Sequence, residues 1–298
     1  MPARSTAHRI ERFVPWLLRG AWLAVVVLAM PALDGAFENR SDSVHDVARI
    51  VGAALWVIGV AAMAVPAVVS LTATRVVVPL SVPVSLATAF AGADAAVAAL
   101  FVASALAATF LAASAPLGRA FVQASAYGDE DRHLLRPPLA YLAFAALTWV
   151  VWAGAVLVGP LLLADRRWVV GGITCALAVA AAAWAWRRWH TLSRRWFVLV
   201  PTGVVVHDQL VLGETLMVRR NDLTALRLAP AGTEALDLTG PAAGHAVEVV
   251  TRSPTTAIMA ATPKTPRGRV LHFTACLVSP TRPGQLLGAA RDRRLPVG

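Results

Sequence analysis

Residues 186–196 are Trp186-Arg187-Arg188-Trp189-His190-Thr191-Leu192-Ser193-Arg194-Arg195-Trp196. Before this stretch, residues 14–186 consist largely of Ala, Val, Leu and Trp, in long runs with almost no charge. After it, short runs of β-branched and aromatic residues alternate with turn residues, as in a water-soluble β domain. The sequence therefore predicts an N-terminal tail (1–13), a transmembrane domain (14–186) and a soluble C-terminal domain (187–298).

The composition of the 298-residue chain agrees with this division. Hydrophobic residues make up 57% of the chain and charged residues 15%, against about 25% charged residues in soluble domains. The net charge is +10, and residues 187–298 carry 15 Lys and Arg against 7 Asp and Glu. Basic residues of membrane proteins gather on the cytoplasmic side, where they attract anionic lipids. We therefore expect membrane lipids of the inner leaflet as partners, possible association with another protein, and no binding of nucleic acid.

Six segments are predicted to span the membrane, because a spanning helix needs about 20 apolar residues. The first contains Arg19, whose guanidinium is expected to reach the headgroups. It resembles a signal peptide, but the five later segments favour a retained helix. The third is short and contains Pro79 and Pro83, so it either spans the membrane with a kink or is re-entrant. The segments are 14–33, 50–71, 76–91, 95–115, 139–163 and 168–186.

Loop charges give the expected orientation. Loop 33–49 is rich in acids and is predicted to be external, whereas Arg75, loop 116–138 and the C-terminal domain are predicted to be cytoplasmic. The turn 165–167 is the one exception to the charge rule, because it is predicted to be external although it contains Arg166 and Arg167. We expect six helices with both termini in the cytoplasm of a bacterium and the helices in its plasma membrane. If segment 76–91 is re-entrant, five helices span the membrane and the N-terminus lies outside.

The C-terminal domain is expected to be a small α+β barrel or sandwich. Period-2 patterns predict strands, and a helix after Pro280-Thr281-Arg282-Pro283 closes the domain, with Thr281 as its N-cap. The stretch from Arg194 to Asp208, followed by Arg219-Arg220-Asn221-Asp222-Leu223, resembles a bacterial PH-like domain. The predicted strands are 195–200, 204–208, 215–220, 223–228, 246–252, 256–261 and 269–278.

The whole chain also resembles uncharacterised actinobacterial multi-pass membrane proteins that end in a PH-like domain. In these proteins a cytoplasmic loop similar to Ala126-Tyr127-Gly128-Asp129-Glu130 precedes a stretch similar to Leu135-Arg136-Pro137-Pro138. The resemblance implies a fold and a location at the membrane, and it implies no particular activity.

Two clusters of polar residues are candidate sites. Asp129, Glu130, Asp131, Arg132 and His133 form a loop that could hold a hard cation, remain solvated, or dock on the C-terminal domain through ion pairs. Consecutive acids point in different directions, which favours a solvated or docking loop over a cation site. The second cluster is an aromatic and basic collar, expected either to anchor the chain at the interface or to recognise anionic headgroups. Its members are Arg187, Arg188, Trp189, Arg194, Arg195 and Trp196.

No pattern typical of an enzyme occurs in the sequence. GxSxG, HExxH, Walker and GxGxxG motifs are absent. Adjacent strand residues such as His207 and Asp208 point to opposite faces and do not form a catalytic pair. Asp94 is expected to cap a helix after an external turn. The isolated Cys175 and Cys276 are expected to be buried structural thiols. We expect no catalytic residue, cofactor or metal.

These observations predict a non-enzymatic scaffold or regulatory protein of the plasma membrane. Its membrane-proximal PH-like domain is expected to bind a protein partner or anionic lipid. The alternative is a transporter, or a transporter subunit, for a lipid or small molecule, because Pro79, Pro83 and Pro160 could break helices around a cavity. An enzyme acting on lipid would need a polar cluster at the membrane face, and loop 129–133 is the one candidate.

Overall fold

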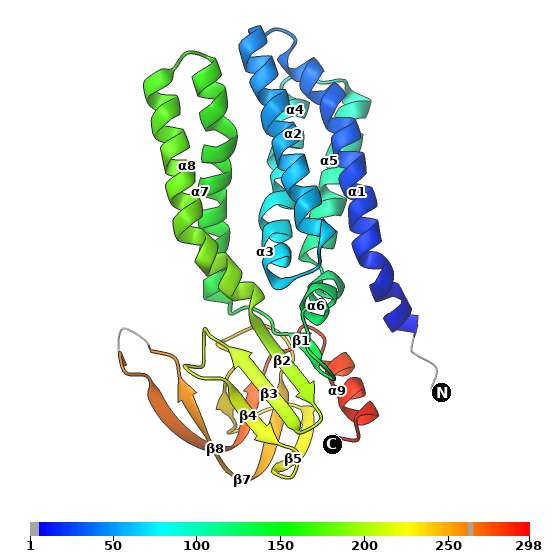
Figure 1. The fold of residues 1–298 in the computed structure, drawn as a ribbon, viewed down its shortest axis with the longest axis vertical. Coiled ribbons are helices and arrows are strands. Elements are labelled where there is room, and N and C mark those ends of the chain that lie inside the picture. The colour runs from blue at the N-terminus through cyan, green and yellow to red at the C-terminus, as the bar shows by residue number, and fades with distance from the viewer. Residues whose placement is uncertain (1–5, 262–264) are drawn as a thin grey trace. The chain divides into compact units, whose positions relative to one another are not determined.

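The computed structural model describes residues 6–261 and 265–298, with the side chains of residues 6–12 left undescribed. The described residues include six helices long and apolar enough to cross a membrane, followed by a domain of two β-sheets and a C-terminal helix (Figure 1). The predicted fold class is therefore confirmed. The chain forms two compact units, a helical unit (residues up to 121 and 145–189) and a sheet unit (122–144 and 190–298).

The helical unit begins with five helical stretches that run up to residue 113. The third spanning segment, Val68–Phe90, combines α3, a 3-10 turn at Pro79 and α4, so it is long enough to cross a membrane. Two further spanning helices, α7 and α8, follow α6 and a loop. The bounds are α1 Thr6–Phe37, α2 Asp42–Ala64, α3 Val68–Val77, η1 Val78–Leu80, α4 Ser81–Phe90, α5 Ala95–Ala113, α6 Ala115–Ala124, α7 Leu139–Ala164 and α8 Trp168–Ser193.

Several predicted bounds were wrong. The second helix ends at Ala64 instead of residue 71, because Pro66 cannot continue it. Arg75 was placed in a cytoplasmic loop, but it lies inside α3. α8 continues to Ser193, past the predicted boundary at residue 186. Helix α1 begins at Thr6, within the predicted N-terminal tail, and the rest of that tail, including Arg4, lies outside the described residues.

Arg19 of α1 and Arg75 of α3 each donate to the C-terminal end of a neighbouring helix. Arg19 Nη2 donates to the carbonyl of Met63 at 2.7 Å, one residue before α2 ends. Arg75 Nε donates to the carbonyl of Ala112 at 3.3 Å, one residue before α5 ends. The last carbonyls of a helix lack partners in their own helix and carry the negative end of its dipole. Arg19 therefore binds a protein carbonyl, where the sequence predicted contact with headgroups.

Asp94 caps α5, as predicted. Its Oδ1 accepts hydrogen bonds from the backbone N–H groups of Ala96 and Val97, both at 3.0 Å. Gly92, with φ of 99°, provides the turn between α4 and α5. This acid is therefore part of a helix end, where its negative charge faces the positive end of the helix dipole.

The sheet unit contains two four-stranded sheets, in the orders β1-β2-β3-β4 and β5-β7-β8-β6. Its core combines apolar side chains of both sheets and α9, including Phe197, Leu226, Cys276 and Leu286. The bounds are β1 Asp131–Leu134, β2 Arg195–Val200, β3 Gly203–Asp208, β4 Leu216–Arg219, β5 Leu223–Leu228, β6 Leu236–Asp237, β7 Val247–Met259, β8 Arg269–Val278 and α9 Pro283–Asp292.

Two features of this unit differ from the sequence prediction. Residues 131–134, expected in a loop, form the strand β1, which pairs antiparallel with β2. The N-cap of α9 is Arg282, not Thr281, and no side chain caps the helix. Thr281 instead donates its backbone N–H to the carbonyl of Leu134 at 2.9 Å. The pairing of β1 therefore determines the conformation of the chain just before α9.

Candidate functional site

The sheet unit holds the loop 125–138 against the C-terminal strands through backbone pairing. In the register of β1 and β2, Asp131 lies opposite Leu199 and Leu134 opposite Trp196. Just before β1, the Asp129 carboxylate accepts a hydrogen bond from Arg293 at 2.6 Å. Ladder hydrogen bonds satisfy backbone groups that would otherwise need water. The loop is therefore a structural part of the C-terminal domain.

The side chains of this loop do not converge on one point. Glu130 forms an ion pair with Arg132 at 2.8 Å, and His133 is buried, with Nε2 3.4 Å from Asp131. Within residues 13–261 and 265–298, whose side chains the structure describes, no three His, Cys, Asp or Glu residues gather in a way that could hold a metal ion. The carboxylates of Asp129, Glu130 and Asp131 instead pair with different partners.

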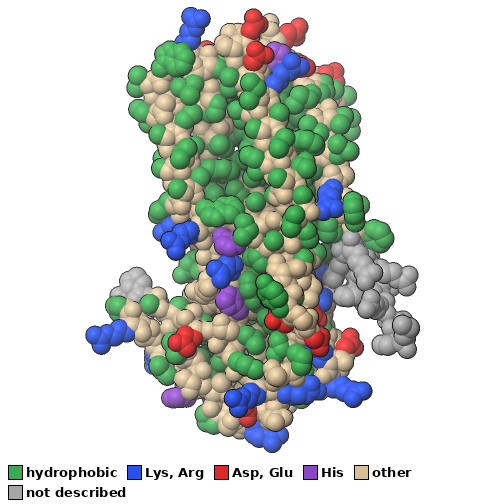
Figure 2. Space-filling model, in the orientation of Figure 1, with side chains coloured by type: hydrophobic (Ala, Val, Ile, Leu, Met, Phe, Trp, Pro, Cys, Tyr) green, Lys and Arg blue, Asp and Glu red, His purple; other side chains and the backbone are tan. Residues whose placement is uncertain are grey.

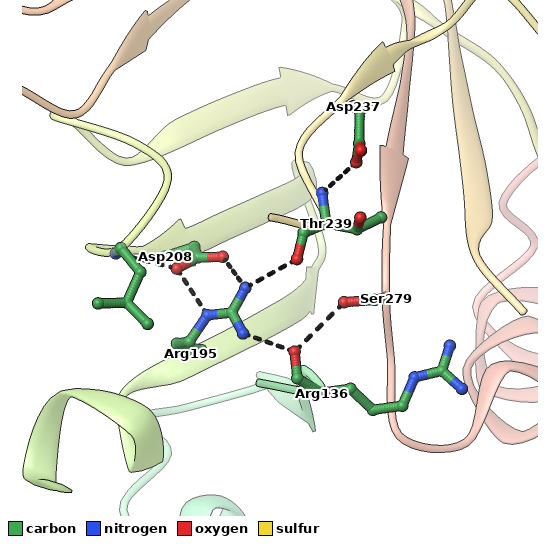
Figure 3. Close-up of polar contacts among 7 residues, drawn as sticks. Arg136, Arg195, Asp208, Asp237, Thr239 and Ser279 are labelled. Atoms are coloured by element: carbon green, nitrogen blue, oxygen red, sulfur yellow. Dashed lines mark hydrogen bonds and ion pairs between the residues drawn. The ribbon is translucent and has the colours of Figure 1, made fainter. Parts of the chain in front are cut away.

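Arg195 is the centre of a buried polar cluster (Figure 3). It lies opposite Asp208 in the register of β2 and β3. Its Nε donates to Asp208 Oδ1 at 2.8 Å and its Nη2 to Oδ2 at 2.6 Å. Its Nη1 donates to the carbonyl of Arg136 at 2.5 Å, and its Nη2 also to the carbonyl of Thr239 at 3.3 Å. One guanidinium therefore joins two strands, the loop that carries β1, and the loop after β6.

The neighbours of this cluster complete its hydrogen bonding. Asp208 Oδ1 also accepts from the backbone N–H of Leu210 at 3.1 Å. The Ser279 hydroxyl lies 3.4 Å from the carbonyl of Arg136, and the Arg136 N–H donates to the carbonyl of Ser279 at 2.7 Å. Arg195 is 0% exposed and Asp208 2% exposed. A buried bidentate pair whose partners all belong to the same domain organises structure.

The expected interfacial collar is therefore smaller than the sequence predicted. Arg195 and Trp189 are buried, so the expectation that they contact lipid headgroups is wrong. The indole Nε1 of Trp189 donates to the carbonyl of Ala145 at 3.2 Å, inside the helical unit. Arg187 and Arg188 are exposed on α8, whereas Arg194 is half-buried. Arg188 lies 3.7 Å from the ring centroid of Trp184, a cation–π contact.

Trp196 stacks between two side chains on the face of the first sheet opposite Arg195. Its ring lies 4.9 Å from that of His207, with 19° between the planes, and the Arg132 guanidinium lies 5.4 Å from its centroid. Burial and the charge of Arg194 lower the pKa of His207 below its usual 6.5, with a smaller contribution from Arg132, although Asp208 opposes this. His207 is therefore neutral at neutral pH, and it faces away from Asp208, as predicted.

The two thiols show no feature of a nucleophile. Cys276 is completely buried in β8, and burial, reinforced by the charge of Glu248, raises the pKa of its thiol to about 12. Cys175 lies half-buried in α8, and both are free cysteines. Because the thiolate is the reactive form, Cys276 reacts only when the domain opens.

The stability of the sheet unit depends on pH through the carboxyl group of Glu248. Burial raises the pKa of this carboxyl, but hydrogen bonds from Thr233 at 2.6 Å and Arg227 at 2.7 Å outweigh burial and hold the pKa below 4.5. A carboxyl with a lowered pKa stabilises the folded state above its unfolded-state pKa, and this contribution is lost as the pH falls below that value.

We expect the denaturant midpoint of the full chain in detergent to fall between about pH 6 and about pH 3.5, and to fall less in Glu248→Gln, which cannot be protonated. Glu234→Gln, a change at an exposed acid two positions from β6, is the matched control and should keep the full decrease. Equal decreases in the Glu248→Gln variant and the unchanged protein would contradict this role of Glu248.

The helical unit contains one large apolar cavity of about 810 Å³. It is lined by residues of α1, α2, α4, α5 and α7, and no charged side chain lines it. The face shown in Figure 2 has a recess between α2 and the pair α7–α8, surrounded by hydrophobic side chains. The sequence raised a cavity near Pro79, Pro83 and Pro160 only as an alternative. Pro79 and Pro83 line this cavity and Pro160 does not, and the other walls come from segments far apart in the chain.

Comparison with known proteins adds no relative: no protein-family model, no curated protein and no solved structure matches this chain.

Proposed function

We propose that this chain is a non-enzymatic, multi-pass protein of a bacterial plasma membrane, in which a PH-like domain at the cytoplasmic face binds a protein partner or anionic lipid. The main support for this proposal is that two separate stretches of the chain form the sheet unit. β1 lies between α6 and α7, and β2 begins two residues after α8 ends. Four residues separate β1 from α7 and one separates α8 from β2. The chain therefore enters the sheet unit at two separate places, each with few connecting residues.

The fold of the sheet unit supports the PH-like part of the proposal. A PH-like domain is expected to have strands in two packed sheets and a closing C-terminal helix, and this unit has four strands in each sheet, with α9 packed on both through Leu286 and Leu287. The basic charge of residues 187–298 supports the cytoplasmic orientation, since positive residues are retained on that side.

The surface of the sheet unit offers groups suited to binding. Arg219 and Arg291 are exposed, and Arg220 Nη2 donates to the carbonyl of Arg294 at 2.7 Å, which draws the basic residues of β4 and the C-terminus together. Three large apolar side chains are also exposed on strands, at Met217, Leu228 and Val270. Exposed apolar residues beside arginine are typical of interaction surfaces.

To test the proposal, a photo-crosslinking amino acid is placed at Met217, Leu228 or Val270 of the full chain in its native membrane. We expect at least one position to give a discrete product, a partner protein or a lipid, in independent preparations. The same position in an Asp208→Asn background, where the domain is destabilised, should lose that product. If none of the three positions gives a product above that of Thr224, an exposed polar residue of β5, the proposed interaction role is wrong.

The second candidate, a transporter or transporter subunit for a lipid or small molecule, is favoured by the apolar cavity of the helical unit. Pro79 and Pro83 line this cavity, and Pro79 lies in a 3-10 turn that interrupts the third spanning segment. Interrupted helices beside a cavity are common in transporters. No acid lines the cavity, so proton coupling through a carboxylate at this place is not supported.

A further inference from the structure

The cavity of the helical unit is suited to hydrocarbon. The polar side-chain groups of the lining residues are the indole N–H of Trp149 and the hydroxyls of Thr88 and Thr109. Thr88 Oγ1 donates to the carbonyl of Ser85 at 2.9 Å, and Trp149 Nε1 to that of Val76 at 2.9 Å, so both donors are already used. Sugars, ions and nucleotides need several polar partners when they leave water. An apolar ligand with at most one polar contact fits this lining.

Thr109 carries the remaining polar group of the lining residues. Its Oγ1 is buried and has no hydrogen-bond partner within the part of the chain that the structure describes. A threonine within a helix usually bonds a carbonyl one turn earlier, as Thr72 does with Val68 at 3.1 Å. Because Oγ1 is enclosed by protein atoms and Thr109 lies near the end of α5 away from loop 91–94, this residue marks the deep end of the cavity and offers no contact to a group at headgroup level.

The cavity matches the depth of one leaflet. Along α7 its lining runs from Trp149 to Leu161, which is about 18 Å at 1.5 Å per residue. The hydrocarbon core of a bilayer is about 30 Å thick, or about 15 Å per leaflet. A single extended chain of a lipid has the same reach, and the volume lies within the usual range of ligand pockets, about 300–1,000 Å³.

The position of the cavity identifies the leaflet. Its lining includes Leu33 and Phe37 near the end of α1, Ala91 after α4, and Leu161 near the end of α7. These ends lie beside the loops 38–41, 91–94 and 165–167, the side predicted to be external. A partly exposed polar cluster lies at the same end, next to the lining residues Leu33 and Ala48. In it, the Asp34 carboxylate lies 3.0 Å from His45 Nε2 and 2.9 Å from Arg49 Nη2. It offers both signs of charge at headgroup level.

We propose that this cavity is a binding site for one acyl chain of a membrane phospholipid, taken from the leaflet on the side of loops 38–41, 91–94 and 165–167. The chain fills the apolar space between α2, α4 and α7 with its methyl end toward Thr109, and the headgroup lies near Asp34, His45 and Arg49. The site is independent of the interaction role of the sheet unit, since all of its residues belong to the helical unit.

Gly154→Phe tests the site, because Gly154 lines the cavity and a Cβ there meets nothing within 4 Å. Gly172→Phe is the matched control: this exposed glycine of α8 is equally open and does not line the cavity. The full chain is purified from native membranes in mild detergent, and bound lipid is measured by native mass spectrometry. We expect one retained phospholipid per chain, at least about tenfold less in Gly154→Phe, and no change in Gly172→Phe.

A second measurement decides the matter even if Gly154→Phe fails to fold. The unchanged chain is reconstituted with a phospholipid that carries a photoreactive group on its acyl chain. Crosslinks are expected at the lining residues Val82, Leu86, Val150 and Leu157, in excess of those at Leu147 and Val151, which are exposed on α7 and do not line the cavity. Equal labelling of all exposed positions, retention of a free fatty acid in place of a phospholipid, or crosslinking of the lining to a second copy of the chain would each overturn the proposal.

Discussion

Asp208→Asn is expected to destabilise the sheet unit by about 3–5 kcal/mol, because removing one partner of a buried ion pair leaves an uncompensated charge. Arg195 is 0% exposed and keeps its positive charge, whereas the remaining acceptors, the carbonyls of Arg136 and Thr239, are neutral. The same change loosens the loop that carries β1, since Arg195 Nη1 donates to the carbonyl of Arg136.

Cys276 is the natural reporter for this prediction. The full chain with Cys175→Ala is exposed to a thiol reagent at increasing denaturant, and only an open domain reacts, because Cys276 is completely buried. Asp129→Asn is the matched control, the same chemical change in an exposed pair with Arg293, where Asp129 is 73% exposed. Exposed pairs contribute at most about 1 kcal/mol. Equal labelling midpoints for the two variants would show that the Arg195 cluster does not support the domain.

A further variant separates charge from packing. In the double variant Arg195→Met with Asp208→Leu, no charge remains buried, and apolar replacements of such pairs are often neutral or stabilising. We expect it to be more stable than Asp208→Asn. Its free energy of unfolding should nevertheless stay below that of the unchanged protein, because the carbonyls of Arg136 and Thr239 lose a donor. A double variant less stable than Asp208→Asn would contradict the argument.

Gly203→Ala is expected to have the second largest effect. Gly203 connects β2 to β3 with φ of 148°, and a Cβ at this position would lie 2.1 Å from the carbonyl oxygen of Val218 and 2.9 Å from the backbone N of Arg220. Both obstacles are backbone atoms, so the turn itself must shift. The unfavourable φ costs about 1–3 kcal/mol, and the displaced pairing of β3 with β4 adds to this.

Two other glycines are matched controls for this substitution. Gly232→Ala has a positive φ of 74° but open space around the new Cβ, so it should cost less than Gly203→Ala. Gly288→Ala in α9 has open space and helical geometry, and it should stabilise the domain by about 0.5–1 kcal/mol. The three midpoints are measured by Cys276 labelling. A Gly203→Ala variant no less stable than Gly232→Ala would refute the role assigned to the close approach of Val218.

The sequence located the apolar segments but misjudged some of their ends. Apolar composition continues from α2 into α3, so hydropathy alone runs past the turn at Pro66 and leaves Arg75 outside the helix. The carbonyl of Ala112 that receives Arg75 lies 37 residues further along the chain. A charge inside an apolar helix is tolerated when such a partner is present, and the partner is visible only once α3 and α5 are packed.

The polar loop and the collar illustrate the same limit. Asp131–Leu134 has no alternation typical of a strand, and it becomes β1 because β2 offers unpaired backbone groups at its edge. Arg195 follows a predicted membrane exit, which favours a role in topology. A signal for its burial was nevertheless present: Arg195 alternates with Phe197 and Leu199, both completely buried, and so shares their inward face.

By itself, the sequence determined the local features of this protein: the six apolar helices, the alternating strands of the sheet unit, and the cap of α5 by Asp94. Each depends on residues within a few positions of one another, where helical and strand periodicity apply. The burial of Arg195 with Asp208, the pairing of β1 and the apolar cavity between α2, α4 and α7 became visible in the folded chain alone. These depend on contacts between distant segments, and a local pattern carries no information about which distant group will satisfy a buried charge or line a cavity.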